Sequence, residues 1–99
     1  MAMLVALSAF DLRIPGCTSL KEKRSVVKGL TQGLRGKFNV SVAEVDHHDQ
    51  WQRSTIAVSS VAGEGFHLRK VAHEVERFVA RQPAVEIIEH RMTLHGPDD

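Results

Sequence analysis

The spacing of apolar residues changes period along this chain, and the order of those changes restricts the fold more than any other feature. Residues 3–12 place apolar side chains on both alternating faces, which predicts a strand in the middle of a sheet. Ser19, with Glu22 three residues later, is a capping-box pattern. It predicts a helix that runs to about Gly36.

The rest of the chain shows the same two periods in a new order. Residues 38–43 alternate with period two and residues 54–61 are rich in β-branched side chains, so we expect two paired strands joined by a polar loop at 46–50. Apolar residues spaced by three and four within 68–79 predict a second amphipathic helix. Residues 85–94 are then the fourth strand.

The resulting order, β-α-β-β-α-β, predicts an α+β fold of the ferredoxin-like type. In this sandwich a four-stranded antiparallel sheet carries two helices on one face, because both crossovers are right-handed. Residues 1–99 are expected to form a single domain, with 96–99 as a short frayed tail. The other sheet face stays open, and such a face commonly serves a ligand, a nucleic acid or a second copy.

Composition predicts a globular protein without an internal disulfide, a membrane span or a signal peptide. Apolar residues make up 42% of the chain and charged residues 25%, values typical of a soluble globular domain. Cys17 has no second cysteine to pair with, so we expect a free thiol and a reducing cytoplasm. The longest apolar stretch, 1–10, is too short to span a bilayer and lacks the features of a signal peptide. No cofactor is expected.

The first predicted helix concentrates positive charge, although the net charge of the chain is only +1. Four of its basic residues share a sector roughly 60° wide. We call them the basic stripe: Lys21, Arg24, Lys28 and Arg35. The predicted nucleic-acid-binding set is this stripe with two further residues: Lys21, Arg24, Lys28, Arg35, Lys37 and Arg53. Three interpretations stay open: a solvated flank, a surface for the phosphate backbone of RNA, or one for an acidic protein. Lys23 falls on the apolar arc, with its ammonium expected to reach solvent past the helix end.

A second flank of the same helix carries small residues. Ser25, Gly29 and Gly33 lie on it, followed by Gly36, and each glycine costs roughly 1 kcal/mol relative to alanine in a helix. A flank without side chains lets another backbone approach closely, so Ser25, Gly29 and Gly33 are a candidate interface between two copies. The alternative is fraying of the helix together with close packing on the sheet.

The loop between the paired strands holds four potential metal ligands in a row, Asp46, His47, His48 and Asp49. Neighbours in an extended chain point to opposite sides and cannot converge on one ion, so we expect no metal site and assign no role to the histidines. Trp51 follows and either stacks on a nucleobase or packs over the hairpin.

An enzymatic alternative comes from acylphosphatase-type domains, which share this element order and hold phosphate in a loop after the first strand. Arg13, Gly16 and Ser19 resemble such a site only superficially, because the characteristic glycine-valine-glycine-phenylalanine-arginine run is missing. We therefore expect no catalytic residues and no enzymatic activity.

Three separated motifs, at 19–24, 37–44 and 49–53, closely resemble the YlxP-like bacterial domain-of-unknown-function family. The resemblance covers nearly the whole chain and implies a ferredoxin-like, often homodimeric, cytoplasmic protein. Genes of this family frequently neighbour translation-initiation and ribosome-maturation genes, which suggests association with RNA or ribosomal particles. We therefore expect an accessory protein that binds structured RNA through the basic stripe; the alternative is a homodimeric protein-interaction module without nucleic-acid binding.

Overall fold

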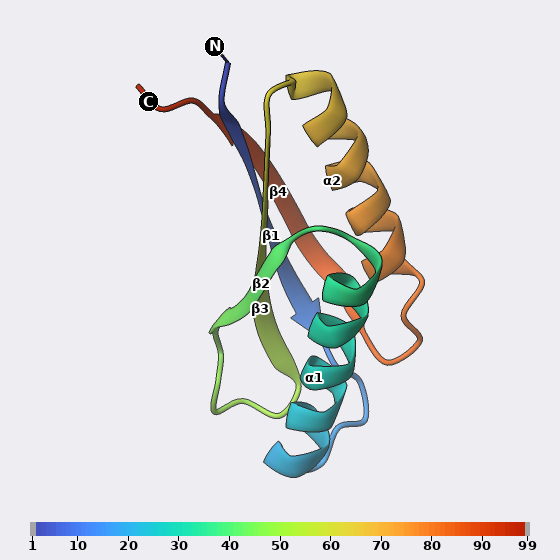
Figure 1. Ribbon diagram of the computed structural model, residues 1–99. Helices are drawn as coiled ribbons and strands as arrows, with labels where there is room; N and C mark the ends of the chain where they lie inside the picture. Colours follow the sequence, from blue (N-terminus) through green and yellow to red (C-terminus); the bar gives the residue numbers. More distant parts are fainter. Residues whose placement is uncertain (1, 99) are drawn as a thin grey trace.

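The computed structural model describes residues 2–98. Its elements follow the predicted order and have these bounds: β1 (Leu4–Arg13), α1 (Leu20–Lys37), β2 (Ser41–Asp46), β3 (Arg53–Ala62), α2 (Gly65–Ala80) and β4 (Glu86–His95). The four strands form one antiparallel sheet in the order β2-β3-β1-β4. Both helices cover the same face of this sheet, as Figure 1 shows. The predicted ferredoxin-like architecture is confirmed.

The core lies between the helices and the covered sheet face. On β1 the even-numbered residues Phe10 and Leu12 are buried there, whereas the odd-numbered positions point to the open face. Leu34 of α1 and Val79 of α2 are fully buried against the same face. The two-residue period of β1 therefore divides a core side from a side that no other element covers.

The second strand begins later than its sequence pattern predicts. Phe38 is the C-cap of α1, where its N–H donates to Leu34 O at 2.9 Å. Its ring packs edge to face on Phe78 of α2, with the ring centroids 6.0 Å apart. The alternating residues from Phe38 onward thus continue the helix end, and β2 starts at Ser41 and extends to Asp46.

The start of β1 and the end of β4 lie side by side at one end of the sheet (Figure 1). Residues 96–98 follow β4 as a short turn, and the last residue of the predicted tail, Asp99, lies outside the described residues. Neither of the helices in the described part of the chain is long and apolar enough to cross a membrane.

Candidate functional site

The start of α1 is closed by the chain's own side chains. Ser19 Oγ accepts a hydrogen bond from Glu22 N at 3.1 Å, as the capping pattern predicts. The Glu22 carboxylate accepts from Thr18 N at 2.9 Å and from the Thr18 hydroxyl at 3.1 Å. That carboxylate therefore occupies the position at the positive helix end, and the N–H donor, that a bound phosphate would need. Arg13, the other residue of the acylphosphatase comparison, lies beside Glu86 at 3.9 Å.

Three members of the basic stripe project from α1 into solvent. Lys21, Arg24 and Lys28 are all exposed, and within residues 2–98 no carboxylate forms an ion pair with any of them. Their spacing of three and four residues keeps them on one side of the helix. The structure therefore presents an uncompensated row of cations along the first three turns of α1.

Arg35, the fourth member, shows which way the basic stripe faces. Its Nη2 donates to Val42 O at 2.5 Å, so the side chain reaches from α1 to the edge strand β2. Because Arg35 shares a helix sector with Lys28, the basic stripe overhangs the β2 edge of the sheet. The contact also places a charged group beside backbone that another strand could otherwise pair with.

Lys37 and Arg53 do not join the basic stripe. Lys37 lies on the flank of α1 that faces α2, where its Nζ is 5.8 Å from the ring centroid of Phe38 and 5.6 Å from that of Phe78. Arg53 is the register partner of Arg13 and faces the open side of the sheet. The six predicted nucleic-acid-binding residues are therefore distributed over three surfaces.

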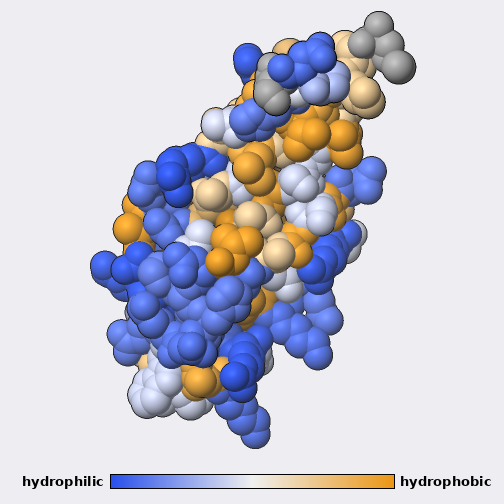
Figure 2. Space-filling view, turned by 90° about the vertical axis from the view of Figure 1, so that its left-hand side faces the viewer, coloured by the Kyte–Doolittle hydropathy of each residue, from blue (hydrophilic) through white to orange (hydrophobic). Residues whose placement is uncertain are grey.

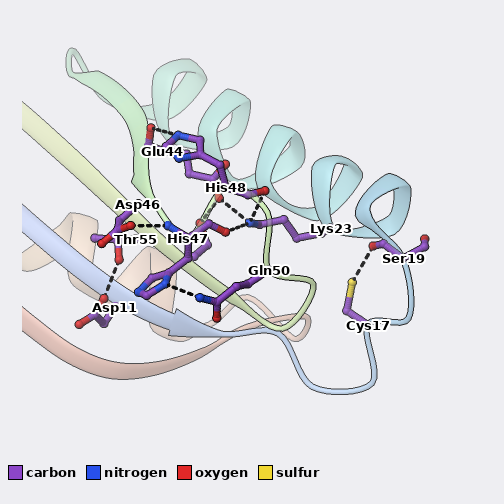
Figure 3. A network of polar contacts seen from close by, with 11 residues as sticks. Asp11, Cys17, Ser19, Lys23, Glu44, Asp46, His47, His48, Gln50 and Thr55 are labelled. Atoms are coloured by element: carbon purple, nitrogen blue, oxygen red, sulfur yellow. Dashed lines mark hydrogen bonds and ion pairs between the residues drawn. The ribbon is translucent and has the colours of Figure 1, made fainter.

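Lys23 is fully buried, so the prediction that its ammonium reaches solvent is wrong. Its Nζ lies 2.9 Å from Glu44 Oε2 and donates to His47 O at 2.6 Å (Figure 3). Ser54 Oγ donates to the same carboxylate at 2.6 Å. A lysine on an apolar helical arc, followed by an acid on the inward side of the next strand, was the available signal for this contact.

The environment of Glu44 favours its charged form. Burial of this carboxylate acts to raise its pKa, but the hydrogen bonds from Ser54 and Lys23 and the charge of Lys23 outweigh that effect. The pKa of Glu44 is consequently lowered from its ordinary value. Lys23 and Glu44 thus form an internal ion pair that fixes the start of α1 to β2.

The histidines of the loop between β2 and β3 make contacts within that loop and with the end of β2. His47 adopts a positive φ of 61°, and its N–H donates to Asp46 Oδ1 at 2.7 Å while its carbonyl accepts from Gln50 N at 3.1 Å. The His48 ring lies 3.1 Å from Glu44 O. Within the described residues, no group of three or more potential ligands could hold a metal ion.

The small-residue flank of α1 is partly filled from within the chain. A Cβ on Gly33 would lie 2.9 Å from Phe78 Cζ, so this glycine allows α2 to pack closely against α1. Gly33 therefore has a packing partner in α2, and its place in the interface between two copies stays a prediction. Ser25 is exposed and Gly29 has open space around its Cβ position.

The start of β3 is joined to the loop after β1. Ile14 N donates to Gln52 O at 2.9 Å, and Gln52 Nε2 donates to Cys17 O at 3.2 Å. Cys17 is a buried free thiol, as predicted, whose Sγ donates to Ser19 O at 3.4 Å. The neighbouring Trp51 is 50% exposed.

The open face of the sheet is apolar beside the first half of β1, whereas Asp11 and Arg13 of the same strand and Arg91 of β4 bring charged groups to the face. Val5 and Leu7 of β1 are 37% and 42% exposed, and Val61, the register partner of Val5, is 68% exposed. Figure 2 shows the hydrophobic band on this face, with hydrophilic side chains over its lower part. The molecule therefore has a charged helix layer and, behind it, an uncovered apolar surface.

Comparisons with known proteins agree with this fold. The crystal structure of a dimeric protein of unknown function and ferredoxin-like fold from Bacteroides fragilis NCTC 9343 gives a TM-score of 0.58 at 13% identity, covering 95% of this chain and 95% of that one. The de novo designed protein Foldit4 gives a TM-score of 0.53 at 13% identity, covering 91% and 96%. At such low identity these structures bear on the fold alone.

Sequence comparison identifies the family. The uncharacterized protein YlxP of Bacillus subtilis (strain 168) is 35% identical over 68 residues, which cover 69% of this chain and 74% of that protein. The family model described as protein of unknown function (DUF503) matches residues 5–92. The resemblance to YlxP-like proteins is thereby confirmed, and the chain belongs to the DUF503 family.

Proposed function

We propose that this protein is a non-catalytic accessory protein that binds RNA or a ribosomal particle through the basic stripe of α1. The observation that carries the proposal is the exposed row of Lys21, Arg24 and Lys28, which no described carboxylate neutralises. Lysine and arginine side chains on a phosphate backbone release counterions, and this gives affinity without readout of the bases. A single buried thiol is compatible with a reducing cytoplasm, where such a function belongs.

The internal ion pair supports this function indirectly. Lys23 stands between these cations in sequence but points inward to Glu44, which fixes the rotation of α1 about its own axis. Arg35 fixes the other end of the same helix to β2. A cationic surface held at both ends loses less conformational entropy on binding than a flexible one.

Charge reversal tests the proposal. The triple variant Lys21→Glu, Arg24→Glu and Lys28→Glu should abolish retention of structured RNA, and in wild type the logarithm of affinity should fall with the logarithm of salt with a slope of about 2 to 3 from these contacts. The matched comparison uses double variants: Lys21→Glu with Arg24→Glu is compared with Arg69→Glu and Lys70→Glu, which are exposed residues of α2 outside the basic stripe. Equal binding by the two double variants, or unchanged binding by the triple variant, would contradict the proposal.

A second candidate is a homodimeric interaction module without nucleic-acid binding. The exposed side chains of Val5, Leu7 and Val61 favour it, because a contiguous apolar face is commonly an interface. The Bacteroides fragilis structure of similar fold is described as dimeric, which supports a dimer here. Co-sedimentation with ribosomal particles before and after ribonuclease treatment separates the two candidates, since only the RNA-binding protein should be released by the nuclease.

A further inference from the structure

The C-terminal ends of the two helices meet around a solvent-accessible hollow of about 470 Å³. Lys37 and Phe38 line it from the end of α1, and Arg77, Phe78 and Arg81 line it from the end of α2. Its volume falls within the roughly 300 to 1,000 Å³ that is usual for small-ligand sites. We call it the helix-end hollow; it lies on the flank of α1 opposite the basic stripe.

The helix-end hollow contains an aromatic surface. The rings of Phe38 and Phe78 meet edge to face with their centroids 6.0 Å apart, and both side chains are only half-buried. The absence of a side chain at Gly33 leaves the room that the Phe78 ring occupies. A flat apolar group entering the hollow can therefore contact aromatic ring surface.

The same hollow carries cations with free hydrogen-bond donors. The Lys37 ammonium lies within 6 Å of both ring centroids, a cation–π geometry, and pairs with no described carboxylate. The guanidinium groups of Arg77 and Arg81 make no hydrogen bond or ion pair to any residue within 2–98. All three side chains are thus available to an anion.

The carbonyl groups at the two helix C-termini do not fully explain why these cations are here. The last carbonyls of α2 already accept hydrogen bonds from other groups: Arg81 N donates to Arg77 O at 3.1 Å, and Gln82 Nε2 donates to Phe78 O at 3.0 Å. The guanidinium groups therefore remain unused by the backbone that they adjoin.

The charge of the helix-end hollow indicates the charge of its ligand. Its lining contains three cationic side chains and one carboxylate, that of Glu74. Each helix C-terminus adds about half a negative charge, so about one positive charge remains. A phosphodiester, with one negative charge, matches this better than a phosphate dianion.

We propose that the helix-end hollow binds one unpaired nucleotide of single-stranded RNA. Its base lies against Phe38 and Phe78, and its phosphodiester contacts Lys37, Arg77 and Arg81. Stacking on aromatic side chains tolerates any base, so the site selects unpaired over paired nucleotides instead of a sequence. The choice of RNA rests on the proposed function, but the residues are separate from the basic stripe.

The test is an NMR titration of the full chain with the tetranucleotide r(AAAA), with adenosine and inorganic phosphate as separate probes. The tetranucleotide should shift the ring resonances of Phe38 and Phe78 and bind more tightly than either smaller probe. The double variant Lys37→Gln and Arg81→Gln should bind it about tenfold more weakly. The control is the double variant Arg69→Gln and Lys70→Gln. It also removes two positive charges, but from a part of α2 outside the hollow, and it should change affinity less than about twofold.

Four outcomes would overturn the inference: no shift at millimolar tetranucleotide, shifts centred on Lys21, Arg24 and Lys28 instead of the rings, equal losses in both double variants, or phosphate binding as tightly as r(AAAA). A parallel titration with a blunt RNA duplex separates this site from the proposed function. Duplex binding lost on reversal of the basic stripe, without r(AAAA) binding in the hollow, refutes only this inference. The converse result refutes only the proposed function.

Discussion

The Lys23 ammonium and the Glu44 carboxylate lie 2.9 Å apart in the interior of the molecule, where the lysine side chain is fully buried and that of Glu44 is 18% exposed. The pair joins the first turn of α1 to the edge strand β2. Desolvation makes an internal ion pair costly to form, but removal of one partner is costlier, because it leaves the other charge uncompensated. The contact therefore determines where α1 sits on the sheet.

Replacement of Lys23 by methionine should lower the free energy of unfolding by about 3 kcal/mol, since the Glu44 carboxylate loses its counter-ion and His47 O loses one of its two donors. Urea unfolding near pH 7 measures this change. Lys21→Met, which removes the same charge from an exposed site, should stay within about 0.5 kcal/mol of wild type. A Lys23→Met protein as stable as the Lys21→Met protein would show that the internal ion pair does not hold the fold.

The lowered pKa of Glu44 predicts a pH dependence of stability. A carboxyl group whose pKa is lower in the folded than in the unfolded state stabilises the fold above its ordinary pKa, which is 4.5 for glutamate. That contribution disappears as the pH falls through the lowered folded value, because the group is then protonated in both states. The difference in unfolding free energy between wild type and Glu44→Gln should therefore be largest near pH 6 and shrink toward pH 3. A difference that stays constant over this range would contradict the assignment.

The order of strands and helices could be predicted because hydrophobic period is a local property of each segment. Errors arose where a residue's environment is set by a distant partner. Phe38 looked like the first residue of a strand, but its ring packs on Phe78 of the second helix. The Lys23 ammonium was expected in solvent, but it forms an ion pair with Glu44 of β2.

The candidate site shows the same limit. A helical wheel correctly grouped Lys21, Arg24 and Lys28, because it needs only the axis of one helix. It could not show that Lys37 faces α2 or that Arg53 lies on the opposite side of the sheet, since both depend on the packing of other elements. The helix-end hollow was beyond prediction for the same reason: it exists only where two helix ends meet.

Two glycines of α1 should respond differently to the same substitution. Gly29 has open space at its Cβ position, so Gly29→Ala should stabilise the protein by up to about 1 kcal/mol through helix propensity. Gly33→Ala gains the same propensity but places a methyl group 2.9 Å from Phe78 Cζ. The second variant should therefore be at least about 1 kcal/mol less stable than the first by thermal or urea unfolding. Equal stabilities would mean that the Phe78 ring moves aside without cost.

The apolar open face predicts self-association through β1 and β3. Val5, Leu7 and Val61 lie on this face, and a second copy would remove their exposed side chains from water. Wild type should sediment at about 22 kDa, twice the chain mass of 11.0 kDa, at micromolar concentration.

The double variant Leu7→Lys and Val61→Lys should sediment as a monomer, because it places like charges on an apolar face that must lose its water. Phe66→Lys is the control, since Phe66 is 82% exposed on α2, away from this face. A wild-type mass of 11 kDa would contradict self-association, and a dimer that survives the double variant but not Phe66→Lys would place the interface elsewhere. Retention of RNA binding by the monomeric double variant would further show that the basic stripe acts within one chain.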